Sequence, residues 1–104
     1  MSDFANVSVS KEANVYFDGQ VTSRAIVFAD GTRKTLGVML PGEYEFATEV
    51  QELMEITSGE LEVLLPGAAQ WQTFGADSSF EVPAAVTFGV RVKAITNYVC
   101  SYFS

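Results

Sequence analysis

The sequence contains no histidine and only one cysteine, Cys100, in 104 residues. Transition-metal sites in proteins are built mainly from imidazole and thiolate ligands, so we expect neither a metal nor another cofactor. A single cysteine cannot form an internal disulfide. Cys100 stands in the run TNYVCSYF, among strand-forming residues, where a free cysteine is typical of a small buried hydrophobe. The alternative, a reactive thiol, would need a basic or helix-terminal setting.

Positive charge and long apolar runs are also scarce. Six Lys and Arg residues stand against 13 Asp and Glu residues, which gives a net charge of −7. This balance argues against nucleic acid as a partner, although one small anion held by one or two arginines still fits. No apolar run approaches the length of a membrane span, and the N-terminus lacks a signal-peptide pattern. We therefore expect a soluble, cytoplasmic protein without a membrane partner.

The chain does have enough apolar residues for a core. Hydrophobic residues make up 48% of it, and its length fits one domain and not two. We therefore expect a single domain over residues 1–104. Residues 1–12 are small and polar, so we expect them to form a frayed N-terminal extension.

The hydrophobic pattern repeats mostly every two residues, which is typical of strands. The dipeptides Asp30-Gly31 and Pro41-Gly42 predict turns between such runs. About ten short strands favour an antiparallel sandwich or barrel, and the shortage of polar faces favours a homodimer that covers one sheet face. One stretch, 48–56, is ambiguous: Thr48 is a potential cap for a short helix, but we interpret the second half as a strand.

Acidic residues alternate with aromatic residues in the segment EYEF. In a strand, Glu43 and Glu45 share one face and Tyr44 and Phe46 share the other. Glu52 shares a face with apolar neighbours, which suggests that it points inward. Our hypothesis is that up to three carboxylates converge inside a barrel. The alternative is that Glu43 and Glu45 face solvent while Tyr44 and Phe46 fill the core, because charged residues are rarely buried.

The spacing of residues 37–59, GVMLPGEYEFATEVQELMEITSG, resembles the first cupin motif. Glu43 and Glu45 occupy the positions of its two histidines, Glu52 that of its glutamate, and Gly37 and Gly59 frame the ends. The resemblance implies a cupin-like antiparallel β-barrel of the jelly-roll type without the usual metal site. A hard-cation site built from the glutamates is an alternative.

The second cupin motif is matched less well. Pro83 is present, but Asp77, Ala85 and Phe88 stand where that motif has a glycine, a glycine and a histidine. This region supports the fold implied by the first motif and offers no ligand for a metal.

Longer strings extend the resemblance beyond cupins in general. YFDGQV, LGVMLPGEYEF, MEITSGELEVLLPGA, FEVPA and NYVCSY are similar to the pyrimidine/purine nucleoside phosphorylases, a family of small single-domain cupins, over nearly all of 15–102. The resemblance implies a pentosyltransferase that uses inorganic phosphate as co-substrate. It would reversibly cleave purine and pyrimidine nucleosides, uridine and adenosine among them, to the free base and ribose 1-phosphate. Other members carry histidines after Pro83, where this chain has Ala84, Ala85 and Gly89.

Such a reaction needs a group that holds phosphate, and arginine has the best geometry for that role. Arg33 precedes the Gly37 frame, and Arg91 follows Pro83 in the strand pattern. We assign both to phosphate or substrate binding; the alternative is that both are solvated charges at strand edges.

The reaction also needs groups that stabilise a cationic sugar and help the base to leave. We assign these catalytic roles to Glu43 and Glu45, and substrate binding to Glu52. A close carboxylate pair can retain one proton at neutral pH. Tyr44 and Phe88 are candidates for stacking on the base, although aromatic residues are more often part of a core.

Two other functions fit the same residues. One is a non-catalytic cupin module that binds a nucleoside, a sugar or an anion. The other is a sugar-processing cupin isomerase or lyase that uses the same carboxylates.

Overall fold

The structure is a computed structural model that describes residues 3–103, and its regular secondary structure is almost entirely β-strand. The strands are β1 (Ser8–Val9), β2 (Asn14–Tyr16), β3 (Val21–Val27), β4 (Arg33–Met39), β5 (Gly42–Ala47), β6 (Gln51–Leu64), β7 (Gln72–Gly75), β8 (Ser78–Val82) and β9 (Thr87–Phe103), with a 3-10 turn, η1 (Phe17–Gly19). The pairings between these strands are all antiparallel, which confirms the predicted fold class. Within the described part of the chain, no helix has both the length and the apolar character needed to cross a lipid bilayer.

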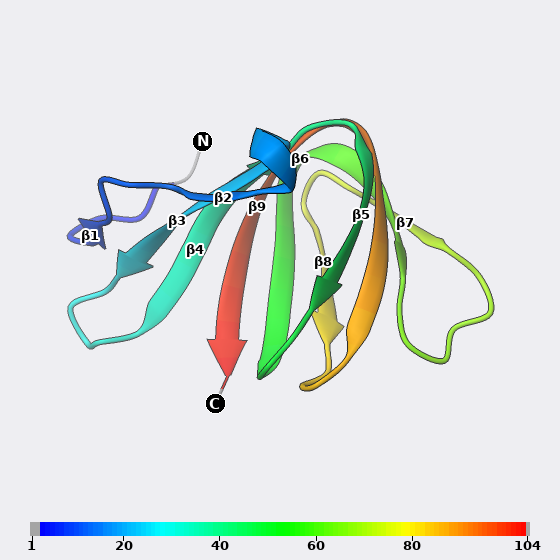
Figure 1. Cartoon of the computed structure of the whole chain (residues 1–104). Coiled ribbons are helices and arrows are strands. Elements are labelled where there is room, and N and C mark those ends of the chain that lie inside the picture. The colour runs from blue at the N-terminus through cyan, green and yellow to red at the C-terminus, as the bar shows by residue number, and fades with distance from the viewer. Residues whose placement is uncertain (1–2, 104) are drawn as a thin grey trace.

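Two long strands, β6 and β9, hold the fold together. The first part of β9 pairs with β5 and the second part with β4, while β6 pairs with β9 along nearly its whole length. The first part of β6 also pairs with β8, and its second part with β7. Figure 1 shows the second part of β9 (red) and the first part of β6 beside β3 and β4, and the first part of β9 (orange) on the far side, beside β5 and β7. Each long strand therefore contributes to both halves of the barrel.

A group of β-bulges lets the two long strands bend between the halves. The register between β6 and β9 shifts between Ile56 and Leu61, and bulges of this kind bend a strand and increase its twist. Gly59 lies within this region at φ 99°, and a Cβ there would overlap the backbone of Ile95 and Thr96. A glycine is needed at this bend for both reasons.

The hydrophobic core lies between the two halves. Phe88, Val90 and Val92 of β9 are all buried, as their alternation along the sequence predicts. Tyr44 of β5, the direct partner of Val90, is buried on the same face of the sheet, and Phe46 packs against the same core cluster. The interior therefore takes one face of each strand, and the opposite faces of β5 and of the first part of β9 are turned outward.

Thr48 does not cap a helix, so the helical alternative for 48–56 is wrong. Its hydroxyl donates a hydrogen bond to the Pro83 carbonyl oxygen at 2.7 Å and accepts one from the Val86 amide at 3.1 Å. These bonds tie the β5–β6 loop to the β8–β9 loop. The chain then continues directly into β6 at Gln51, as we predicted for the second half of the stretch.

Several large apolar side chains remain exposed outside the core. Residues 3–12 are mostly exposed, although β1 pairs with β3 and the Phe4 ring packs edge-on against Phe28. Residues 1–2 of the expected extension lie outside the described part. Leu36, Ile95 and Phe103 are also exposed. The fraying of the extension and the homodimer both stay predictions.

Candidate active site

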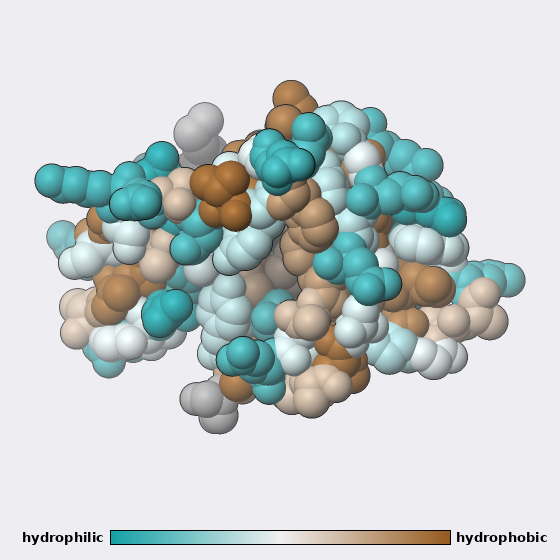
Figure 2. Space-filling model, viewed as in Figure 1, coloured by the Kyte–Doolittle hydropathy of each residue, from teal (hydrophilic) through white to brown (hydrophobic). Residues whose placement is uncertain are grey.

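A cavity of about 170 Å³ lies inside the barrel. Residues of β2 to β6 and of β9 line it. Figure 2 shows the surface hollowed over β6 and β9, with hydrophobic residues at the bottom and along the right-hand edge and more hydrophilic residues along the left-hand edge. Pockets for drug-sized ligands usually measure ~300–1,000 Å³, so this cavity is large enough for part of such a ligand.

Four polar side chains from four strands meet in this cavity: Ser23, Thr35, Glu52 and Cys100. The strand register explains why they do. Thr35 and Cys100 are direct partners across β4 and β9, and Cys100 is also opposite Met54 of β6. Glu52 precedes Met54 by two residues and so shares its inward face. Long-range pairing therefore gathers groups that are up to 77 positions apart in the chain.

Three tyrosines complete the polar lining. Tyr98 is buried and packs on Gly37, its direct partner in β4, where any side-chain atom would overlap the ring. Tyr102 donates to or accepts from the Thr35 hydroxyl at 3.0 Å. Burial raises the pKa of both Tyr98 and Tyr102 above the ordinary value, so both stay neutral. Tyr16 and Tyr102 are also partly exposed, at 48% and 40%, and thus form part of the cavity's opening.

Glu52 is the acidic residue among the described residues that line this cavity. Burial raises the pKa of its carboxyl, and a contact with Cys100 acts in the opposite direction. The Cys100 sulfur lies 3.4 Å from Oε1 of Glu52. The prediction that Glu52 points inward is confirmed. A carboxyl in this setting keeps its proton to a higher pH than an exposed one does.

The hypothesis that Glu43 and Glu45 point into the barrel is wrong. Both are exposed, and the side chain of Glu43 is 74% accessible. Pairing of β5 with β9 sets Tyr44 opposite Val90 and Phe46 opposite Phe88, so the aromatic residues take the inward face. The alternation was predicted correctly, but the prediction assigned the wrong face to the interior. The aromatic face is the inner one because burying two charged groups costs more free energy than burying two aromatic rings.

The two aromatic residues assigned to base stacking have different positions. Phe88 is buried and lines the cavity. Tyr44 is also buried, but its hydroxyl donates to the Leu40 carbonyl oxygen at 2.6 Å, and it does not belong to the lining of the cavity. The structure therefore gives Tyr44 a place in the core, and a contact between Phe88 and a base stays a prediction.

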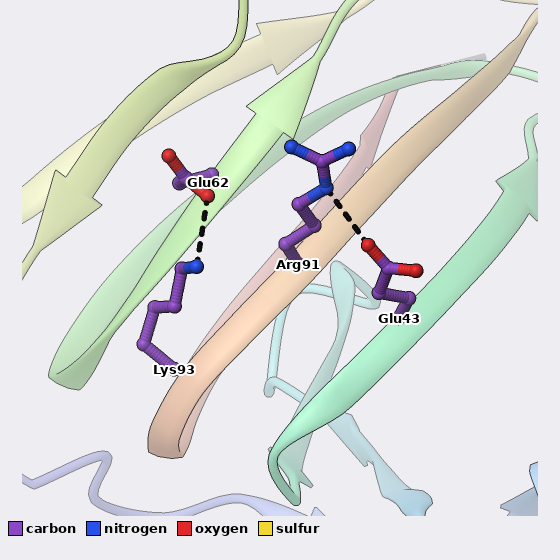
Figure 3. Close-up of polar contacts among 4 residues, drawn as sticks. All are labelled: Glu43, Glu62, Arg91 and Lys93. Atoms are coloured by element: carbon purple, nitrogen blue, oxygen red, sulfur yellow. Dashed lines mark hydrogen bonds and ion pairs between the residues drawn. The ribbon is translucent and has the colours of Figure 1, made fainter.

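A second, wider hollow of about 610 Å³ lies on the outer face, between β5, β9 and the loop that precedes β7. Arg91 is there. Its Nε donates to Glu43 at 2.9 Å, and its guanidinium stacks 3.9 Å from the ring of Trp71. Lys93 pairs with Glu62 at 3.2 Å on the same face (Figure 3). These charges neutralise one another in contact with solvent, and the sheet separates them from the interior cavity.

Arg33 lies at the edge of the barrel. It is exposed, and as the first residue of β4 it shares the inward face with Thr35. Lys34 is the partner of Ser101, so continuing the register by one residue sets Arg33 across from Tyr102. This position is compatible with a phosphate held at the cavity opening, and that role stays a prediction.

The acidic residues do not gather into a metal site. Glu52 is inside, while Glu43 and Glu45 are outside, so the sheet divides them. Among residues 3–103, no group of three acidic or cysteine side chains lies together as a metal site requires.

Sequence reasoning missed most of the neutral lining of the cavity. Tyr98, Cys100 and Tyr102 alternate along β9, and this alternation was a signal that they share a face. Ser23 and Thr35 gave no such signal, because isolated hydroxyl residues are common in strands.

Residues 11–102 match the family described as pyrimidine/purine nucleoside phosphorylase. Proteins of that name from Hydrogenovibrio crunogenus and Sulfurovum sp. are 57% and 60% identical to this chain. Each alignment covers 98% of this chain, and 98% and 99% of the respective relatives.

Solved structures show the same fold. A protein of unknown function from Acinetobacter sp. ADP1 is 41% identical and superposes with a TM-score of 0.94, over 97% of this chain and 98% of that one. An RmlC-like cupin from Shewanella frigidimarina has a TM-score of 0.70 at 17% identity, over 96% of this chain and 86% of that one, which shows the fold alone. The predicted cupin-like barrel is confirmed. By sequence, the chain belongs to the pyrimidine/purine nucleoside phosphorylase family.

Proposed function

We propose that this protein is a nucleoside phosphorylase of broad specificity, a pentosyltransferase that reversibly converts a nucleoside and orthophosphate into the free base and ribose 1-phosphate. Family membership supports the reaction class. The observation that carries the proposal is Glu52, a half-buried carboxyl with a raised pKa in a cavity otherwise lined by neutral groups. Such a carboxyl keeps its proton to a higher pH than an exposed one does, which suits it to general acid catalysis.

In this reaction the C1′–N bond breaks, and its electron pair goes to the base. A phosphate oxygen then bonds to C1′. Glu52 in its protonated form gives its proton to the departing base and regains one from hydrogen phosphate, so protons balance over the cycle. A substrate that fills the cavity removes water from around Glu52 and so favours the protonated form further.

The cavity's size supports broad specificity. At about 170 Å³ it holds only part of a nucleoside, so the rest extends through the opening, where Tyr16 and Tyr102 expose their rings. Stacking on an aromatic ring tolerates purines and pyrimidines alike. Arg33 at the edge supplies the positive charge for phosphate. We expect nucleosides and phosphate as the only partners of this site, with no further cofactor.

The test measures free base released from uridine and from adenosine, with and without phosphate. We expect release only with phosphate. Glu52→Gln should lower kcat about a hundredfold or more, the usual contribution of a general acid. Glu43→Gln, a matched change on the outer face, should stay within about twofold of the unchanged protein.

Two outcomes would contradict the proposal. Release without phosphate would indicate a hydrolase. Binding of nucleosides without any release would favour the non-catalytic cupin module.

A further inference from the structure

The thiol of Cys100 is fixed in the centre of the barrel. Cys100 is buried and pairs with Thr35 on one side and Met54 on the other. Its sulfur lies 3.4 Å from Oε1 of Glu52. Among residues 3–103, it is the one protein donor within hydrogen-bond distance of this carboxyl.

The thiol keeps its proton under physiological conditions. Burial, and after it the charge of Glu52, raises the pKa of Cys100 to about 12. The group is therefore a poor nucleophile, which agrees with the prediction of a buried, unreactive cysteine. It is instead a weak S–H donor aimed at an acceptor.

We propose that Cys100 is a positioning residue for Glu52, and that its S–H donates to Oε1 so that Oε2 carries the proton transferred to the base. This inference rests on the proposed function. The bond fixes the rotation of the carboxyl group about its terminal torsion, which is otherwise broad. It also favours the ionised form, so it limits how far burial raises the pKa of Glu52.

The other groups that face Glu52 do not take over this role. From β9, Tyr98 and Tyr102 are neutral, because burial raises the pKa of both. From β8, the partner of Glu52 is Val82, and the neighbouring Glu81 points to the other face. On β2 the facing group is Tyr16 and on β4 it is Thr35, and Arg33 lies at the edge of the barrel.

The experiment compares Cys100→Ala with Cys100→Ser, because serine keeps a donor at the same position. Two quantities are measured: the pH profile of kcat/KM for uridine phosphorolysis at saturating phosphate, and the titration of the Glu52 carboxyl by NMR. Val99→Ala is the matched control, since Val99 is a buried neighbour on the opposite face of β9. Thermal unfolding confirms that each variant is folded.

For Cys100→Ala we expect kcat to fall roughly three- to tenfold, which is the rate equivalent of one weak hydrogen bond. The Glu52 titration and the alkaline limb of the profile should both move to higher pH. Cys100→Ser should restore most of the rate and the original profile, and Val99→Ala should leave both in place.

An unmoved Glu52 titration in Cys100→Ala would overturn the inference, as would a serine variant that behaves like alanine. The NMR titration needs no turnover. A complete lack of phosphorolysis in the unchanged protein would therefore count against the proposed function, while the titration would still decide whether the thiol controls Glu52.

Discussion

Gly37→Ala tests whether the site depends on one close approach between β4 and β9. Gly37 is the direct partner of Tyr98, whose ring and hydroxyl lie against the glycine. A Cβ at this position would lie well inside 3.0 Å of the ring, a separation that real Cβ atoms essentially never show. Because Tyr98 is buried among core residues, the ring can move only toward the cavity that it lines.

The cost follows from the packing. Overfilling a well-packed core by one methyl group usually destabilises by about 1–3 kcal/mol, and here the overlap falls on a rigid ring, so we expect about 2 kcal/mol. In urea, with a slope of about 1–3 kcal/mol per M, this should lower the unfolding midpoint by roughly 1 M without changing the slope. Displacement of Tyr98 should also weaken nucleoside binding in the cavity.

Gly75→Ala is the matched control. Gly75 is also a strand glycine, and the nearest atom to a Cβ there would be 4.0 Å away, so we expect little loss or a small gain in stability. The double variant Gly37→Ala with Tyr98→Ala removes the obstacle, and the added cost of the glycine change should then disappear. If Gly37→Ala is as stable as the Gly75 control, or if its cost persists without the Tyr98 ring, the overlap does not explain the need for glycine.

Two further predictions concern charge. Burial raises the pKa of Glu52 in the folded state. The stability that the protonated carboxyl contributes is therefore fully present below the ordinary carboxyl pKa, and it is lost as the pH rises through the folded-state pKa. In chemical denaturation, Glu52→Gln should therefore be more stable than the unchanged protein at pH 8 and equally stable at low pH. Equal stabilities at pH 8 would contradict the view that ionised Glu52 destabilises the fold. In initial-rate assays, Arg33→Ala should raise the KM for phosphate more than the KM for the nucleoside. The control is Arg24→Ala, because Arg24 is an exposed arginine on β3 that bonds to the Lys11 carbonyl; this change should leave the KM for phosphate in place. If Arg33→Ala does not change the KM for phosphate, Arg33 is not part of the site.

Local pattern was enough to predict most strands and turns. The alternation of apolar residues gave the inward face of β9, and the glycine-containing turns placed the ends of β3, β4 and β5. The expectation of about ten short strands does not include one continuous strand over Thr87–Phe103. Its continuity depends on bulges opposite β6, which in turn depend on Gly59 and long-range pairing. A local pattern carries no information about such pairing.

The site was harder to predict than the fold, for a physical reason. Alternation shows that Glu43 and Glu45 share a face, but a shift of one residue exchanges the inside for the outside. Which face of β5 is buried depends on the free energy of burial, and burying two aromatic rings is more favourable than burying two carboxylates. A family motif that places metal ligands at those two positions pointed to the opposite assignment.

Charge is also a poor guide to the residues of this cavity. This chain has a net charge of −7, and its paired charges lie on the outside, as Arg91 with Glu43 and Lys93 with Glu62. The interior is polar through hydroxyl and thiol groups, which give no charge signal in a composition. Within residues 3–103, the lining of the cavity gives this one acid no cationic partner, so its protonation depends on burial and on the Cys100 thiol. A neutral group that carries no charge signal, the Cys100 thiol, is therefore the side chain with the most direct control over the chemistry of Glu52.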